Sequence, residues 1–225
     1  MKKIFILIAS LLVLGGCDSI NSTTTPKLDN TKLIDSAIIE VESKDELLDI
    51  ETRITYDMSD IMLKIKNNNN HNINKLNIRA EYYDDTDKKV GEIEYIYQDV
   101  IKEGTILTYT ALPKGEDYLS YIPNKTKIII SDELEKNNKI KLYNELINVD
   151  YYIKGRVIDL DYSSTSKSEV GEVDVMVLYY KNNKMVNYQE SIIKKLSDKN
   201  HKYDQLEIPK NLDYDHVELI INKAK

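Results

Sequence analysis

Apolar and polar residues alternate along much of the chain, and a period of two predicts β-strands that bury one face. The clearest alternating runs are residues 61–66, 76–83, 152–158 and 173–180. Polar residues typical of loops follow at 67–70 and at 159–168. Tyr, Ile, Val and Thr, which suit a pleated and half-buried surface, are frequent in these regions. The pattern therefore predicts an all-β chain.

The same alternation assigns a face to each side chain of the two longest runs. The side chains predicted to point into a core are Ile78, Ala80 and Tyr82 in the first run and Val175, Val177 and Tyr179 in the second. The adjacent Tyr83 and Tyr180 then point to the opposite side of each strand. We consider these two tyrosines as possible interaction residues for a sugar or a peptide, with ordinary cross-strand packing as the favoured alternative.

The two long runs belong to an internal repeat. Residues 76–83 align with residues 173–180, about 97 positions later, and the turns that follow them align after deletion of one residue. A Leu-Pro pair at 112–113 also aligns with an Ile-Pro pair at 208–209. Two copies of about 80 residues exceed the period of solenoid repeats, so the sequence predicts a tandem duplication.

We predict two tandem small immunoglobulin-like antiparallel β-sandwich domains, because short strands at intervals of roughly 8–12 residues with polar turns are typical of that fold. The first sandwich is assigned to residues 55–133, a charged linker to 134–146 and the second sandwich to 147–225. A lead-in segment, residues 32–54, has two open interpretations. Its apolar spacing is compatible with one face of a helix, and residues 38–41 are also compatible with an added strand.

The N-terminus carries the features of an export signal. Two lysines precede an apolar run that is too short to span a bilayer, and the motif Leu-Gly-Gly-Cys follows at 14–17. This arrangement resembles the lipobox of bacterial lipoproteins. The resemblance implies removal of the signal peptide 1–16, acylation of the Cys17 thiol, and anchoring to the extracytoplasmic side of the cell membrane. The polar residues 17–31 then form a flexible tether, which holds the body on the order of 20 Å from the anchor.

The amino-acid composition and the net charge limit the classes of partner that the chain is expected to bind. Cys17 is the single cysteine of the chain, which excludes a disulfide within it. The formal net charge is −7, and loss of the two signal lysines makes it −9. A body of this sign is repelled by phosphate-rich partners. Nucleic acid is therefore not expected as a partner, and adsorption to an anionic lipid surface is disfavoured.

Residues around the first long run resemble a known domain family. The sequence AEYYD at 80–84 ends this run, Lys-Val at 89–90 opens the next, and a Pro followed by Asp-Tyr precedes the last strand. The pattern is similar to that of FxLYD domains, which are small immunoglobulin-like β-sandwiches of bacterial exported proteins and lipoproteins. In the second copy Lys181 replaces the acidic turn residue. The resemblance implies a fold and contributes no catalytic residues.

The sequence contains few residues in a pattern typical of a metal site or a catalytic site. The three histidines do not have the spacing of a metal site; they are His71, His201 and His216. Asp84, Asp85 and Asp87 offer oxygen ligands, but the glycine and glutamate of a calcium loop are missing, so a hairpin turn is favoured. Neither a nucleophile elbow nor a phosphate-binding glycine loop occurs in the sequence. We therefore expect no catalytic residue, no metal and no cofactor.

Together these patterns favour a non-catalytic interaction or spacer module of the bacterial cell envelope. Its partners are expected to be the membrane, through the lipid on Cys17, and an envelope protein or wall component. The alternative is a small cell-surface hydrolase or a solute-binding lipoprotein. The chain lacks the alternating helices and strands of solute-binding lobes and the spaced polar residues of an active site, which weighs against that alternative.

Overall fold

The computed structural model describes residues 30–116, 118–133 and 143–225. In these ranges the chain is almost entirely β, which confirms the predicted fold class. The signal peptide 1–16 and Cys17 lie outside the described residues, as do most of the tether and residues 134–142 of the expected linker. None of the helices within the described ranges has the length and apolar character needed to cross a membrane.

We call the described residues before 134 the N-terminal half and those after 142 the C-terminal half. The elements of the N-terminal half are α1 (Asn30–Ser36), β1 (Ile38–Ser43), β2 (Leu48–Ile54), β3 (Asp60–Asn67), β4 (Ile73–Tyr83), β5 (Lys89–Val100), β6 (Thr105–Ala111) and β7 (Lys125–Glu133). The elements of the C-terminal half are the short 3-10 helix η1 (Asn144–Leu146), β8 (Ile147–Lys154), β9 (Val157–Ser164), β10 (Val170–Lys181), β11 (Lys184–Leu196), β12 (Lys202–Glu207) and β13 (His216–Ala224).

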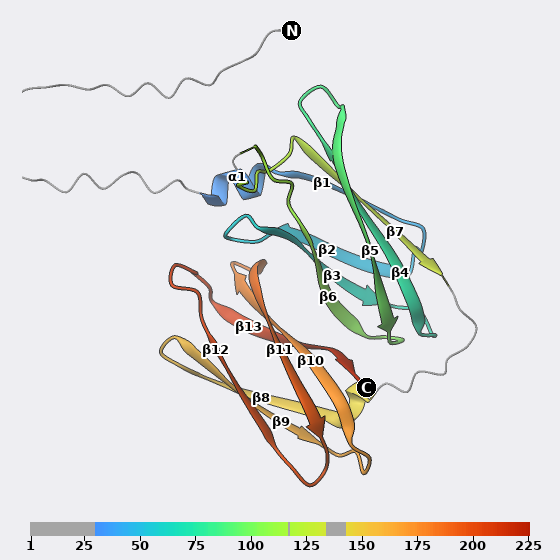
Figure 1. Cartoon of the computed structure of the whole chain (residues 1–225), viewed down its shortest axis with the longest axis vertical. Coiled ribbons are helices and arrows are strands. Elements are labelled where there is room, and N and C mark those ends of the chain that lie inside the picture. The colour runs from blue at the N-terminus through green and yellow to red at the C-terminus, as the bar shows by residue number, and fades with distance from the viewer. Residues whose placement is uncertain (1–29, 117, 134–142) are drawn as a thin grey trace, which may run out of the picture.

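The described strands form four sheets, two in each half. The strand orders are β1–β7–β4–β5 and β2–β3–β6 in the N-terminal half, and β11–β10–β13 and β12–β9–β8 in the C-terminal half. Neighbouring strands pair antiparallel except β1 and β7, which are parallel. Figure 1 shows the sheets stacked, with β1–β7–β4–β5 at one end of the molecule and β12–β9–β8 at the other.

The strand order repeats between the halves. The sheet β2–β3–β6 corresponds to β8–β9–β12, and the strands β5–β4–β7 correspond to β11–β10–β13, so β1 is an addition to the N-terminal half. A β-bulge repeats as well: the register shifts between Tyr82 and Tyr83 in β4 and between Tyr179 and Tyr180 in β10. A bulge at the same aligned position of both strands agrees with the internal repeat inferred from the sequence.

The lead-in segment 32–54 combines both of its open interpretations. It starts in α1, continues as β1 and ends with β2. Because β2 pairs with β3 from Leu48 opposite Asn67 to Ile54 opposite Ile61, the strands of the first sheet pair begin before the boundary placed at residue 55.

Two further expectations about the second half are wrong. Residues 152–158 are not one strand, because β8 ends at Lys154 and Gly155 turns the chain with a φ of +63°. The expected loop 159–168 is a strand over its first part, because β9 continues to Ser164. The glycine is the signal for the turn, and the alternation of apolar Ile158 and Leu160 with polar neighbours is the signal for the strand.

Two core clusters fill the space inside the sheet pairs. The first contains Ile78, Ala80 and Tyr82, and the second contains Val175, Val177 and Tyr179, so the predicted inward faces are confirmed. Both tyrosine rings are buried, and each hydroxyl has a partner: Tyr82 donates to the carbonyl of Ala111 at 2.5 Å, and Tyr179 donates to Gln189. Apolar burial with a satisfied hydroxyl is the low-energy arrangement for a tyrosine in a core.

A third cluster joins the two halves. Its buried members are Met62 and Leu107 from the N-terminal half and Met176, Leu178, Tyr180, Met185 and Ile220 from the C-terminal half. The sheets β2–β3–β6 and β11–β10–β13 are therefore covered on both faces. The corresponding sequence signal is the loss of alternation at 175–180, which is apolar or aromatic at every position.

A buried amide reinforces this contact. Asn222 is 2% exposed, and its side-chain amide donates to the carbonyl of Leu107 and accepts from the Leu107 N–H, both at 2.8 Å. The side chain thus pairs with the backbone of β6 as a neighbouring strand would. Because a buried amide without partners is costly, this pair of bonds favours one alignment of the two halves.

Candidate functional site

The best candidate site lies on the outer face of the sheet β12–β9–β8, at the end of the stack. Alternation along β9 places Ile158, Leu160 and Tyr162 in the core and leaves Asp159 and Asp161 on the outside. The outer face therefore carries the polar half of the strand pattern, and no other described sheet covers it.

Strand register arranges six outward side chains in two rows across the sheet. In one row Asp159 of β9 lies between Tyr152 of β8 and Gln205 of β12, and in the other row Asp161 lies between Asp150 and Tyr203. Adjacent strands are about 4.8 Å apart, and residues two positions apart on one strand are about 6.6 Å apart. The two tyrosines thus occupy opposite corners of a patch roughly 10 Å wide, with two carboxylates along its middle. We call these six residues the tyrosine–aspartate face.

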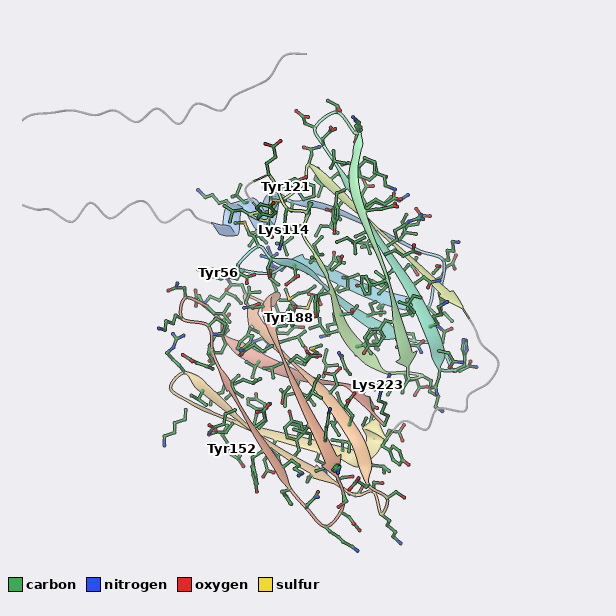
Figure 2. The ribbon with its side chains drawn as sticks, in the orientation of Figure 1. Tyr56, Lys114, Tyr121, Tyr152, Tyr188 and Lys223 are labelled. Atoms are coloured by element: carbon green, nitrogen blue, oxygen red, sulfur yellow. The ribbon has the colours of Figure 1, made fainter. Side chains whose placement is uncertain are left out.

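The two corner tyrosines are among the most exposed aromatic residues of the described chain. Tyr152 is 67% exposed and Tyr203 is 72% exposed. Neither hydroxyl has a hydrogen-bond partner among the described residues. A surface hollow of about 650 Å³ is lined by both tyrosines together with Asp159, Asp161 and Gln205. Figure 2 shows Tyr152 at the outer side of the C-terminal half, away from Tyr188 at the contact between the halves.

The face has an excess of negative charge. Asp159 accepts a hydrogen bond from the Gln205 amide at 2.5 Å, and Asp161 contacts Nδ1 of His201 at 3.0 Å. Asp150 and Asp161 lie directly opposite each other in the β8–β9 register. Two like charges in that position destabilise a sheet. The two rows contain three carboxylates and neither Lys nor Arg, so a cation from outside would relieve this repulsion.

A chain of buried hydroxyls lies behind the face. Tyr162 donates to the Ser191 hydroxyl at 2.5 Å, and Ser191 donates to the carboxylate of Asp204. Burial raises the pKa of Tyr162 to about 12. Ser191 is 2% exposed and donates its proton to an acceptor, so its hydroxyl is not offered to a substrate in the hollow. This chain orders the packing of β11 against β12 and β9.

The described residues include no group of three or more His, Cys, Asp or Glu side chains that could hold a metal ion. What the tyrosine–aspartate face offers is an aromatic surface at two corners, carboxylate acceptors between them and one amide. This arrangement can bind a ligand by stacking, hydrogen bonding and charge.

Of the two tyrosines predicted as possible interaction residues, Tyr180 is not available. It points away from its own core, as expected, but the N-terminal half covers that side and leaves it 6% exposed. Its ring stacks on His216 with centroids 5.0 Å apart, and its hydroxyl accepts a hydrogen bond from Lys64. The expectation failed because strand alternation gives the side of a residue and carries no information about a second sheet on that side.

Tyr83, the counterpart in the first copy, is half-buried and already has local partners. Its hydroxyl donates to Glu81 at 2.7 Å, and Nζ of Lys125 lies 5.0 Å from the ring centroid. The hydrogen bond to Glu81, together with burial, raises the pKa of Tyr83. A role for Tyr83 in binding stays a prediction.

The aspartates 84, 85 and 87 lie in the turn between β4 and β5, as the sequence favours. Asp84 accepts hydrogen bonds from the backbone of Thr86 and Lys88 and from the Thr86 hydroxyl, and these bonds lower its pKa. Asp87 adopts a φ of +58° and pairs with Lys125 at 3.1 Å. The carboxylates thus stabilise a hairpin turn.

The sequence pattern does not reveal the tyrosine–aspartate face, because it predicts a loop for the central residues of that face. Reading 159–164 as a strand would have placed Asp159 and Asp161 on one face, opposite Leu160. The pairing of that face with Tyr152 and Tyr203 depends on the sheet register, which the sequence does not specify.

Comparisons with known proteins leave the family open. No family model matches the chain, and no curated protein matches it. Among solved structures it is similar to red sea bream transglutaminase, with 6% identity and a TM-score of 0.24 over 75% of this chain and 32% of that one. It is also similar to the C-terminal globular domain of oligosaccharyltransferase from Pyrococcus abyssi, with 12% identity and a TM-score of 0.25 over 80% of this chain and 47% of that one. The chain spans less than half the length of either structure. TM-scores this low carry no information about function.

Proposed function

We propose that this chain is a membrane-anchored extracytoplasmic lipoprotein and a non-catalytic interaction module of the bacterial cell envelope. The lipobox-like motif ending at Cys17 supports the anchor. The observation that carries the interaction role is the tyrosine–aspartate face: two exposed tyrosines with Asp159 and Asp161 around a hollow, on a sheet face that no described segment covers. Exposed aromatic residues beside polar groups are typical of binding surfaces.

The order of the layers supports a spacer role for the N-terminal half. The proposed tether leads into α1 of the N-terminal half, whereas the tyrosine–aspartate face lies on the last sheet of the C-terminal half (Figure 1). The third core cluster and the Asn222–Leu107 hydrogen bonds join the halves between these two points. The binding face thus lies on the outermost sheet of the C-terminal half, whereas α1 lies beside the contact between the halves, where Lys184 donates to Asp35.

We also propose that the two halves are tandem FxLYD-like domains. The repeated strand order and the repeated bulge after Tyr82 and Tyr179 support a duplication of one sandwich. The second copy lacks the acidic turn residue of the family at Lys181, which instead pairs with Asp213 and Asp215. These ion pairs tie the β10–β11 turn to the loop before β13.

Crosslinking on intact cells tests the interaction role. The full-length protein would be crosslinked in its native bacterium, extracted from the membrane and compared with a variant that carries Tyr152→Ser and Tyr203→Ser. Tyr118→Ser is the matched control, because Tyr118 is 84% exposed and lies in the N-terminal half.

We expect the wild-type protein and the Tyr118→Ser control to capture the same envelope component in a defined ratio, and the double variant to lose it. Equal capture by all three proteins would exclude the tyrosine–aspartate face as the binding surface. Failure of the wild-type protein to capture any component would contradict the interaction role itself.

A further inference from the structure

We propose that the tyrosine–aspartate face binds an extended segment of a partner protein that carries Lys or Arg at alternate positions. This inference rests on the proposed function and specifies the chemistry of the partner. Three features of the face carry it: its charge, the spacing of its carboxylates and the position of its tyrosines.

The negative charge of the tyrosine–aspartate face favours a positively charged ligand. Asp150, Asp159 and Asp161 project from adjacent positions of two strands, and no Lys or Arg lies among the six residues of the face. His201 contacts Asp161, and the side-chain carboxylate of Asp150 has no hydrogen bond or ion pair with any described residue. A cationic ligand would neutralise the like-charge pair of Asp150 and Asp161, which a neutral ligand cannot do.

The spacing of the carboxylates matches the spacing of alternate side chains in an extended peptide. Asp159 and Asp161 lie two residues apart on one strand and on one face, so about 6.6 Å separates their Cα atoms. Side chains at positions i and i+2 of any extended segment have the same spacing. A segment lying along β9 would therefore place one cation over each carboxylate.

The tyrosines then flank the two cations. Tyr152 lies beside Asp159 and Tyr203 lies beside Asp161, on opposite neighbouring strands. An ammonium or guanidinium group that reaches either carboxylate lies within range of the adjacent ring for a cation–π contact. The free hydroxyls of both tyrosines remain available to the backbone of the segment.

Peptide binding to the full-length protein in detergent tests this inference. The probe is a fluorescent, end-blocked peptide of the repeat Ser-Lys, six residues long. Two matched probes replace every lysine by acetyl-lysine or by glutamate. A chitin oligosaccharide serves as a neutral glycan probe, since aromatic surfaces also bind sugars.

We expect the lysine peptide to bind and the acetyl-lysine and glutamate peptides to bind at least about 10-fold more weakly. Tyr152→Leu should weaken binding of the lysine peptide by about 2- to 5-fold, because leucine keeps apolar area and loses the π-face. Asp159→Asn should weaken binding by a similar factor and reduce its salt dependence. Tyr118→Leu and Asp85→Asn, exposed residues outside the face, should leave binding unchanged.

Equal binding of the lysine and acetyl-lysine peptides would overturn the inference, as would equal effects of the face variants and the control variants. A third outcome is that the wild-type protein binds the chitin oligosaccharide but not the lysine peptide, and that Tyr152→Leu abolishes the chitin binding. This outcome would overturn the cationic peptide as the partner and indicate a neutral glycan instead. No binding of the lysine peptide, together with face-dependent capture in the cell experiment, would reject this ligand class and leave the proposed function standing. Absence of lysine-peptide binding together with absence of face-dependent capture in cells would reject both this inference and the proposed function.

Discussion

Lys64 of β3 donates hydrogen bonds to the hydroxyl of Tyr180 at 2.9 Å and to the carboxylate of Glu218 at 2.7 Å. These bonds connect the N-terminal half to β10 and β13 of the C-terminal half. Burial acts to lower the pKa of Lys64, but the hydrogen bonds to Glu218 and Tyr180 outweigh it and raise that pKa. The charged amine is therefore part of the contact that holds the two halves together.

Replacing Lys64 by methionine should lower the free energy of unfolding by about 1 kcal/mol, because the apolar stem is kept while a half-buried ion pair is lost. Denaturant titration of the full-length protein measures this change. In a double-mutant cycle with Glu218→Gln we expect a coupling energy of about 0.5–1 kcal/mol. Strict additivity of the two substitutions would show that the pair does not contribute to the contact.

Leu178→Ala should cost about 2–4 kcal/mol, because the side chain is fully buried between the halves and its removal leaves a cavity. The aligned position in the first copy is Glu81, on the solvent side of β4. Glu81→Ala is the matched variant and should change the unfolding free energy by less than about 1 kcal/mol. Similar costs at the two positions would mean that the contact between the halves does not stabilise the fold.

Asp174 should make stability depend on pH. It lies on the face of β10 that is turned toward the N-terminal half, and one of its carboxylate oxygens is buried without a partner among the described residues. Burial, helped by the negative charge of Glu190, raises the pKa of Asp174 to about 6, and the neighbouring Asn222 amide and the charge of Lys223 oppose this effect without cancelling it. The folded protein thus binds the proton more tightly than the unfolded chain, so the stability from this group is full below about pH 4 and is lost as pH rises through 6.

Asp174→Asn should therefore stabilise the protein by about 1–2 kcal/mol at pH 7.5, after allowance for partial solvent exposure, and should have little effect near pH 4. Thermal or denaturant unfolding at both pH values measures the difference. Asp85→Asn, at an exposed turn position, is the control and should show no such pH dependence. A destabilising effect of Asp174→Asn at pH 7.5 would show that the carboxylate is needed in its charged form.

Much of the fold could be predicted from alternation. The inward faces of residues 76–83 and 173–180 follow from the side-chain period, and the repeated strand order agrees with the self-similarity of the sequence. The contact between the halves could not be derived in the same way. A run such as 175–180, apolar or aromatic at every position, indicates that both faces of the strand are buried. It does not indicate which segment covers the second face. The parallel pairing of β1 with β7 is also a long-range choice that local sequence does not determine.

The candidate site was less predictable. Alternation correctly turned Tyr180 away from its own core, yet that side is the contact with Lys64 and the N-terminal half. Tyr152 and Tyr203 are about 50 residues apart, and only the shared neighbour strand β9 brings them to one face. Binding faces built from the register of three strands leave no local motif.

Cys17→Ser should block acylation and signal-peptide processing, because the proposed lipobox makes the Cys17 thiol the acceptor of the lipid. The measurement is the intact mass of the membrane-extracted protein. We expect the wild-type protein to begin at Cys17 and carry acyl chains, and the variant to remain an unlipidated precursor. Membrane association of the wild type should survive high salt, since burial of acyl chains is not screened as charge attraction is. A mature wild-type protein that starts elsewhere and lacks acyl chains would contradict the anchor.

Site-specific photocrosslinking in living cells tests whether the outer face of the β12–β9–β8 sheet binds a partner. A photoreactive amino acid would replace Gln205, which lines the hollow, or Asp85, at the exposed β4–β5 turn, in the otherwise unchanged full-length protein. We predict one discrete adduct from position 205, lost when Tyr152→Ser is added, and no such adduct from position 85. The same adduct from both positions, or none from position 205, would contradict the claim that the outer face of the β12–β9–β8 sheet is the binding surface.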